Sequence, residues 1–213
     1  MPTIYSSTND GFVSKTDFSS WSNARDATSG SATSTGNSYS YGVRARSVAG
    51  RGGTQRTVVR SFFEFDTRTI TATPSSADLK IKGVGNGTAD LIAVKSTQSS
   101  TLADTDIDAI TGWSAGADNL GNVTQYSSEV TTWDTSGYNT ISLNATALSD
   151  TVSLDTFKVC LIEYDYDLQN NEPSNTEYGS GVYYADSSGT SNDPYLEYIE
   201  AVTDNSIFFG ANF

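Results

Sequence analysis

The pattern of hydrophobic and polar positions first indicates a strand over residues 57–66, where the sequence reads TVVRSFFEFD. Stretches rich in β-branched and aromatic residues favour strands. One face of this stretch is mostly apolar and is formed by Val59, Ser61, Phe63 and Phe65. The alternate positions form the other face, which mixes apolar side chains with charged ones. We therefore predict a strand with one face buried in the core and the other only partly covered.

A second strand is predicted over residues 77–82, ADLKIK, where two apolar residues alternate with three charged ones. A period of two places the apolar side chains on one face and the charged side chains on the other. The polar stretch before it contains Pro74 and has the composition of a turn. We expect these two strands to form the centre of the core.

Shorter runs of the same kind follow along the chain, separated by segments rich in Gly, Ser, Asn and Asp. They give about nine or ten strands with a turn roughly every 8–12 residues, a spacing typical of a β-sandwich. Short helical turns are predicted near residues 100–110 and 144–148. The sequence therefore predicts an all-β fold, an antiparallel two-sheet sandwich that is jelly-roll-like, with one or two short helical turns.

No break in composition divides the chain, so residues 1–202 are predicted to form a single jelly-roll-like β-sandwich. Residues 203–213 differ from it because they form a short apolar end. Exposed to water, such an end would be sticky, so we expect this C-terminal aromatic tail to pack on its own domain or to dock on a partner. Large apolar side chains dominate the energy of many interfaces. The partner-binding residues expected here are Ile207, Phe208, Phe209 and Phe213.

The charge balance and the absence of one residue type exclude several functions. A net charge of −13 disfavours nucleic-acid and anionic-membrane partners. The chain has no histidine, and so lacks the commonest general base and the commonest metal ligand. With 25 acidic residues, carboxyl pairs at the separation used in glycoside hydrolysis would arise by accident. We therefore expect no enzymatic activity, no nucleic-acid partner and no membrane partner.

Three acids alternate along one predicted strand and are the candidate metal ligands, namely Glu163, Asp165 and Asp167. Side chains at alternate positions of a strand project from one face, and carboxylate oxygens are the ligands that Ca²⁺ takes in proteins. A structural calcium ion is therefore one interpretation, and no other cofactor is expected. The alternative is a solvated acidic face that keeps a strand edge from pairing with another chain.

Aromatic residues are numerous, with 3 Trp, 12 Tyr and 9 Phe. Such rings either fill the core of a sandwich or present their faces to a ligand such as a sugar. If they form a carbohydrate-binding surface, the candidate residues are Trp21, Tyr183 and Tyr184. For Trp113 and Trp133 the core is the better interpretation.

One run of residues resembles a known family. The stretch Arg60-Ser-Phe-Phe-Glu-Phe-Asp66, followed by Ile70, a turn with proline and Ser76-Ala-Asp-Leu-Lys-Ile81, is similar to the central motif of DNRLRE-type jelly-roll modules. Further matches follow in order, at Asp10-Gly-Phe-Val13, Trp113, Ile141-Ser-Leu-Asn144 and residues 187–197. The resemblance spans about residues 3–200. It implies a carbohydrate-binding-module-like jelly roll of the kind found in bacterial and archaeal surface proteins.

The acidic jelly roll with its aromatic tail also resembles, more loosely, virion proteins of tailed bacteriophages that serve as capsid decorations, cement proteins or tail appendages. Residues 1–3 do not open a signal region, so we expect the chain to be made in a host cytoplasm and to reside in the virion. The first hypothesis is a non-enzymatic structural protein of a phage particle that contacts other virion subunits and forms a homo-oligomer. The alternative is a carbohydrate-binding module on an extracellular surface, which adheres to a cell-surface polysaccharide.

Overall fold

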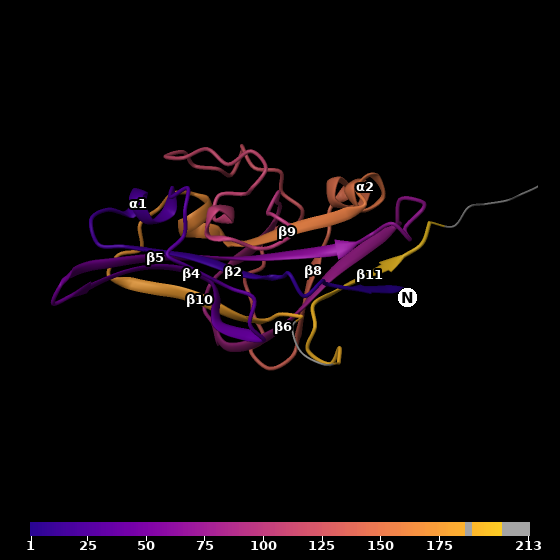
Figure 1. Cartoon of the computed structure of the whole chain (residues 1–213), viewed down its shortest axis with the longest axis horizontal. Coiled ribbons are helices and arrows are strands. Elements are labelled where there is room, and N and C mark those ends of the chain that lie inside the picture. Colours follow the sequence, from indigo (N-terminus) through magenta and orange to yellow (C-terminus); the bar gives the residue numbers. More distant parts are fainter. Residues whose placement is uncertain (186–188, 202–213) are drawn as a thin grey trace, which may run out of the picture.

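The structure is a computed structural model that describes residues 1–185 and 189–201 (Figure 1). The chain is built from antiparallel strands with a few short helices, which confirms the predicted all-β class. None of the helices in these two ranges is both long and apolar enough to cross a membrane. The tail residues Ile207, Phe208, Phe209 and Phe213 lie outside the described residues.

The strands are β1 (Thr3–Tyr5), β2 (Gly11–Asp17), β3 (Ala32–Ser34), β4 (Ser38–Gly50), β5 (Gly53–Asp66), β6 (Ser76–Gly87), β7 (Leu91–Lys95), β8 (Tyr138–Ser142), β9 (Thr156–Glu163), β10 (Thr176–Tyr183) and β11 (Tyr195–Ile199). The α-helices are α1 (Trp21–Arg25) and α2 (Ala145–Ser153). A 3-10 turn, η1, spans Asp104–Asp106, and a π-helical turn, η2, spans Tyr164–Leu168.

The strands form two sheets that share one strand. Sheet A contains β1, β11, β6 and β8 in that order, and sheet B contains β10, β4, β5, β2 and β3, with β9 added to β5 and β7 added to β9. The first part of β6 pairs with β11 and β8, and its last part pairs with β10. Figure 1 shows the long strands β4, β5 and β10 side by side. Because β6 runs from one sheet into the other, the two sheets face each other across a common core.

The central strand β5 is covered on both faces. Phe63 and Phe65 lie in the core between the sheets, together with Leu79 and Ile81 of β6. Phe62, on the opposite face, lies in a second apolar cluster. The prediction that this second face is only partly covered is therefore wrong.

The second face is covered by residues 97–125, called here the covering segment. Its apolar side chains pack on β5, β7 and β9, and they include Leu102, Ile107, Ile110 and Val123. Apart from the turn η1 it contains no helix or strand, and Figure 1 shows it looping above β5 and β9. An irregular segment of this kind has no periodic pattern, so its role as a layer cannot be predicted from alternation.

Candidate functional site

The charged side chain of β5 that points into the second cluster is Arg60, and it is fully buried. Its Nε and Nη2 atoms donate hydrogen bonds to the two carboxylate oxygens of Asp167, at 2.8 and 2.7 Å. Its Nη1 atom donates to the main-chain oxygen of Ile107 in the covering segment, at 2.6 Å, and Nη2 also donates to that of Arg25, at 2.9 Å. This two-point pairing is the strong form of an arginine–carboxylate contact.

A second arginine, Arg25 at the end of α1, joins the same cluster. Its Nε atom donates to the main-chain oxygen of Asp167 at 2.5 Å, and its Nη2 atom donates to that of Ala117 at 2.9 Å. The guanidinium carbons of Arg25 and Arg60 lie 4.4 and 4.0 Å from the ring centre of Trp113. The cluster therefore fastens α1, β5, η2 and the covering segment together, and its chemistry is structural.

The three predicted metal ligands do not share a strand face, so that prediction is wrong. Strand β9 ends at Glu163, and the chain then turns into η2. The Glu163 carboxylate accepts hydrogen bonds from the main-chain N–H groups of Asp165, Tyr166 and Asp167, at 3.3, 2.7 and 3.0 Å. With Glu163 capping this turn and Asp167 bound to arginine, only Asp165 has a carboxylate available for other ligands.

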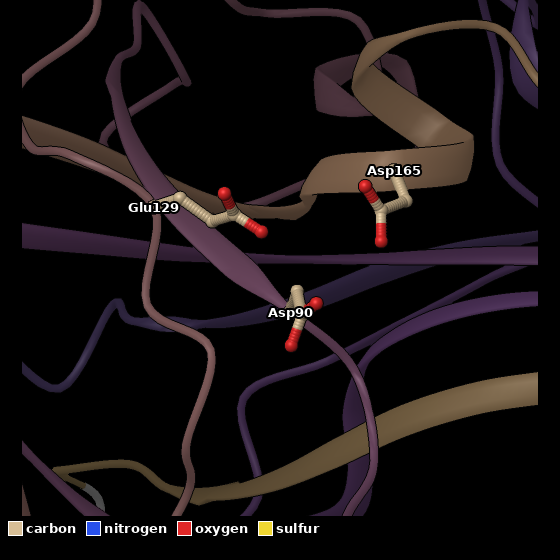
Figure 2. A group of neighbouring side chains, drawn as sticks. All are labelled: Asp90, Glu129 and Asp165. Carbon is tan, nitrogen blue, oxygen red and sulfur yellow. The ribbon is translucent and has the colours of Figure 1, made fainter.

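Asp165 instead approaches two acids that no sequence pattern singles out, Asp90 and Glu129 (Figure 2). One carboxylate oxygen from each lies within 4.8 Å of the others. Burial, and then the nearby charge of Asp165, raises the pKa of Asp90. The pKa of Glu129 is also raised by burial, followed by the charges of Asp165 and Asp90. Calcium takes six to eight oxygen ligands, so these three would provide part of a coordination shell.

The residues predicted to bind sugars lie mostly in the core. Trp21 is 7% exposed and Tyr184 is 2% exposed, so neither ring can stack on a ligand, and the prediction is wrong for both. Tyr184 packs against Phe63 with ring centres 5.8 Å apart. Tyr183 is half-buried, and the Nζ atom of Lys82 lies 5.6 Å from its ring centre.

A different group of aromatic residues lies on the outer face of sheet A and forms the tyrosine cluster of Tyr5, Tyr195 and Tyr138. The ring centres of Tyr5 and Tyr195 are 5.7 Å apart, and those of Tyr195 and Tyr138 are 5.1 Å apart. Tyr5 is 42% exposed. Burial, followed by the neighbouring Tyr195, raises the pKa of Tyr138 to about 12.

Only the outward orientation of these tyrosines could be predicted from the sequence. Tyr5 and Tyr195 are direct partners in the β1–β11 register, and Lys82 pairs with Tyr138 on the neighbouring strands. Alternation predicts that each tyrosine faces outward from its own strand. Their proximity depends on the order of the strands in the sheet, which alternation does not provide.

Comparison with models of known protein families and with curated proteins finds no match for this chain. The resemblance to DNRLRE-type modules therefore stays a prediction. The structure is a β-sandwich with a buried cluster of arginines around Asp167. It also has a small group of three acids and the tyrosine cluster on the outer face of sheet A.

Proposed function

We propose that this protein is a non-enzymatic structural protein of a phage particle, attached to the capsid or to the tail, and that it acts through protein–protein contacts. The observation that carries the proposal is the tyrosine cluster on the outer face of sheet A. Tyrosine is enriched in protein interfaces, because its ring buries a large apolar area while its hydroxyl group still finds a hydrogen-bond partner. The apolar run of residues 203–213 follows closely after β11, which carries one of these tyrosines.

Two further features support a non-enzymatic role. The sequence contains no histidine, which leaves carboxylates as the main candidates for acid–base chemistry. The three most buried candidates are Asp10, Glu163 and Asp167, and each is engaged within the fold. Asp10 accepts hydrogen bonds from the Ser6 hydroxyl and the Ala185 N–H group, Glu163 accepts from main-chain N–H groups, and Asp167 pairs with arginine. These carboxyl groups are engaged in contacts within the fold, which supports a structural role for them.

Incorporation into particles tests the proposal. We expect full-length protein with Phe208→Ser and Phe209→Ser to be depleted from purified particles, because its docking side chains are lost. The matched control is Phe18→Ser, which removes an exposed phenylalanine (57% exposed) from the end of β2 instead. Equal incorporation of the tail variant and the control would count against the proposed role of the tail. Absence of the wild-type protein from purified phage particles would contradict the proposed role as a particle protein.

Carbohydrate binding is the second candidate, and the tyrosine cluster also favours it. Lys80 and Thr140 lie in the rows next to these rings, and the Nζ atom of Lys80 donates to the Thr140 hydroxyl at 2.9 Å, so polar groups that could bind sugar hydroxyls are close by. The rings, however, are inclined to each other by 55° and 62° and do not share a plane. A flat stacking platform for a polysaccharide is therefore less well supported than a protein contact. Glycan-array binding that is lost in Tyr5→Ala would favour the sugar.

A further inference from the structure

Most of the exposed large apolar residues of the described chain lie along one pair of strands. Large hydrophobic side chains with high exposure are Met1, Tyr5, Phe18 and Ile199. Three of these four lie on or beside the paired strands β1 and β11, and only Phe18 lies elsewhere. Grouped exposure of this kind is uncommon on a surface that contacts only water, and it marks interaction sites.

These residues belong to one continuous surface, called here the sheet A face, which consists of the side chains of β1, β11, β6 and β8 that point away from the core. The alternate side chains, such as Leu196 and Ile141, are buried between the sheets. Tyr5 and Tyr195 therefore lie on the outer side, and they share it with charged residues of β6 and β11.

The charges on the sheet A face balance, although the chain as a whole carries −13. The two basic residues are Lys80 and Lys82, and the two acidic ones are Asp78 and Glu197. The Nζ atom of Lys80 lies 3.5 Å from a carboxylate oxygen of Asp78 and 3.7 Å from one of Glu197. Two copies of so acidic a protein repel each other over most of their surfaces. The sheet A face is a region where that repulsion is locally absent.

We infer that the sheet A face is a self-association surface, on which the same face of a second copy packs about a twofold axis. A twofold interface must be complementary to itself. This face meets that condition, because its tyrosines can meet apolar residues of the partner copy, and each lysine can meet a carboxylate across the axis. The inference rests on the proposed function, since it names the first protein partner of the tyrosine cluster.

The size of the face sets the strength that we expect. β1 contributes three residues to this face, and β11, β8 and the first part of β6 contribute about five each. With strands about 4.8 Å apart and about 3.4 Å per residue, the face covers roughly 300 Å². Stable complexes bury about 800 Å² on each partner, which is more than the area of this face. We therefore expect a dimer that forms as the concentration rises, and not a permanent one.

Sedimentation equilibrium of the full-length chain, up to about 1 mM, tests the inference, because a millimolar complex is half formed at that concentration. The wild-type mass should rise toward that of two chains. Tyr5→Glu and Ile199→Glu, which each place a charge on the face at an exposed position, should keep the mass at one chain. Phe18→Glu adds the same charge away from the face and should behave as the wild type does. Circular dichroism would show that all variants are folded.

Three results would overturn the inference. One is a wild-type chain that stays monomeric throughout, whether or not it binds a glycan through Tyr5. Another is a Phe18→Glu variant that loses association as strongly as Tyr5→Glu does, because net charge would then be the cause. The third is association that is lost in Phe208→Ser/Phe209→Ser but kept in Tyr5→Glu, which would assign it to the tail. None of these decides whether the chain enters particles, so the proposed function is tested separately.

Discussion

The buried pair of Arg60 and Asp167 should contribute strongly to stability, and Arg60→Met tests this. Both side chains are fully buried, and Arg60 donates four hydrogen bonds within the cluster. Methionine is unbranched and apolar and can occupy much of the same space. It would leave the Asp167 carboxylate without its closest cation. Breaking a buried pair in this way costs about 3–5 kcal/mol.

For a chain of this length, 1 kcal/mol corresponds to about 2–4 °C, so Arg60→Met should melt roughly 6–20 °C below the wild type. Urea unfolding followed by circular dichroism gives the free energy of unfolding by linear extrapolation. The matched control is Arg68→Met, which breaks an arginine–aspartate pair with Asp66 on the surface, where the side chains are 68% and 57% exposed. We expect no measurable change there, because exposed pairs are screened by solvent.

The double variant Arg60→Met/Asp167→Leu separates the two causes of the loss. When both members of a buried pair become apolar, no unpaired charge remains, so much of the stability should return. Arg25 keeps its pairing with Asp26, at 2.6 Å. If Arg60→Met costs no more than Arg68→Met, the cluster does not hold the covering segment and the reasoning is refuted.

The other predictions concern the acidic groups and one close approach of the backbone. Burial and two neighbouring carboxylates raise the pKa of Glu129 in the folded protein. The folded protein therefore loses stability as the pH rises through that pKa and Glu129 becomes charged. Glu129→Gln should raise the melting temperature at neutral but not at acid pH. Burial raises the pKa of Glu163 from 4.5 to about 8, although hydrogen bonds from three main-chain N–H groups act to lower it. Stability should therefore fall as the pH rises from about 4.5 to 8, which thermal melts at a series of pH values can measure. The fall should be smaller in Glu163→Gln. A Cβ atom on Gly83 would lie 1.9 Å from the main-chain oxygen of Asp134, so Gly83→Ala should cost about 1–3 kcal/mol in urea unfolding, whereas Gly52→Ala, with no atom within 4 Å, should change little.

Much of the fold could be predicted from alternation along single strands. The pattern of residues 57–66 and 77–82 correctly placed Phe63, Phe65 and Ile81 in the core. The same pattern treated Arg60 as a residue of a partly open face, because a charge in a strand usually faces water. Its partner Asp167 lies 107 positions further on. Nothing local to either residue indicates that they pair.

The candidate site could be predicted less well, since it depends on how distant segments meet. The acids after β9 alternate as they would in a strand, but the Glu163 carboxylate caps a turn and redirects the chain. Trp21 and Tyr184 are of residue types that can stack on sugars, but both side chains are buried in the core. The tyrosine cluster depends on the β1–β11–β6–β8 order, and strand order is a tertiary property.

The central claim is that the protein works through contacts made by the outer face of sheet A. The most direct test is to supply wild-type and Tyr5→Glu full-length chains together and to measure their ratio in purified particles by mass spectrometry. We expect Tyr5→Glu to be depleted from particles relative to the wild type, and Phe18→Glu in the same competition to be incorporated as the wild type is. Incorporation of Tyr5→Glu in the ratio supplied would contradict it.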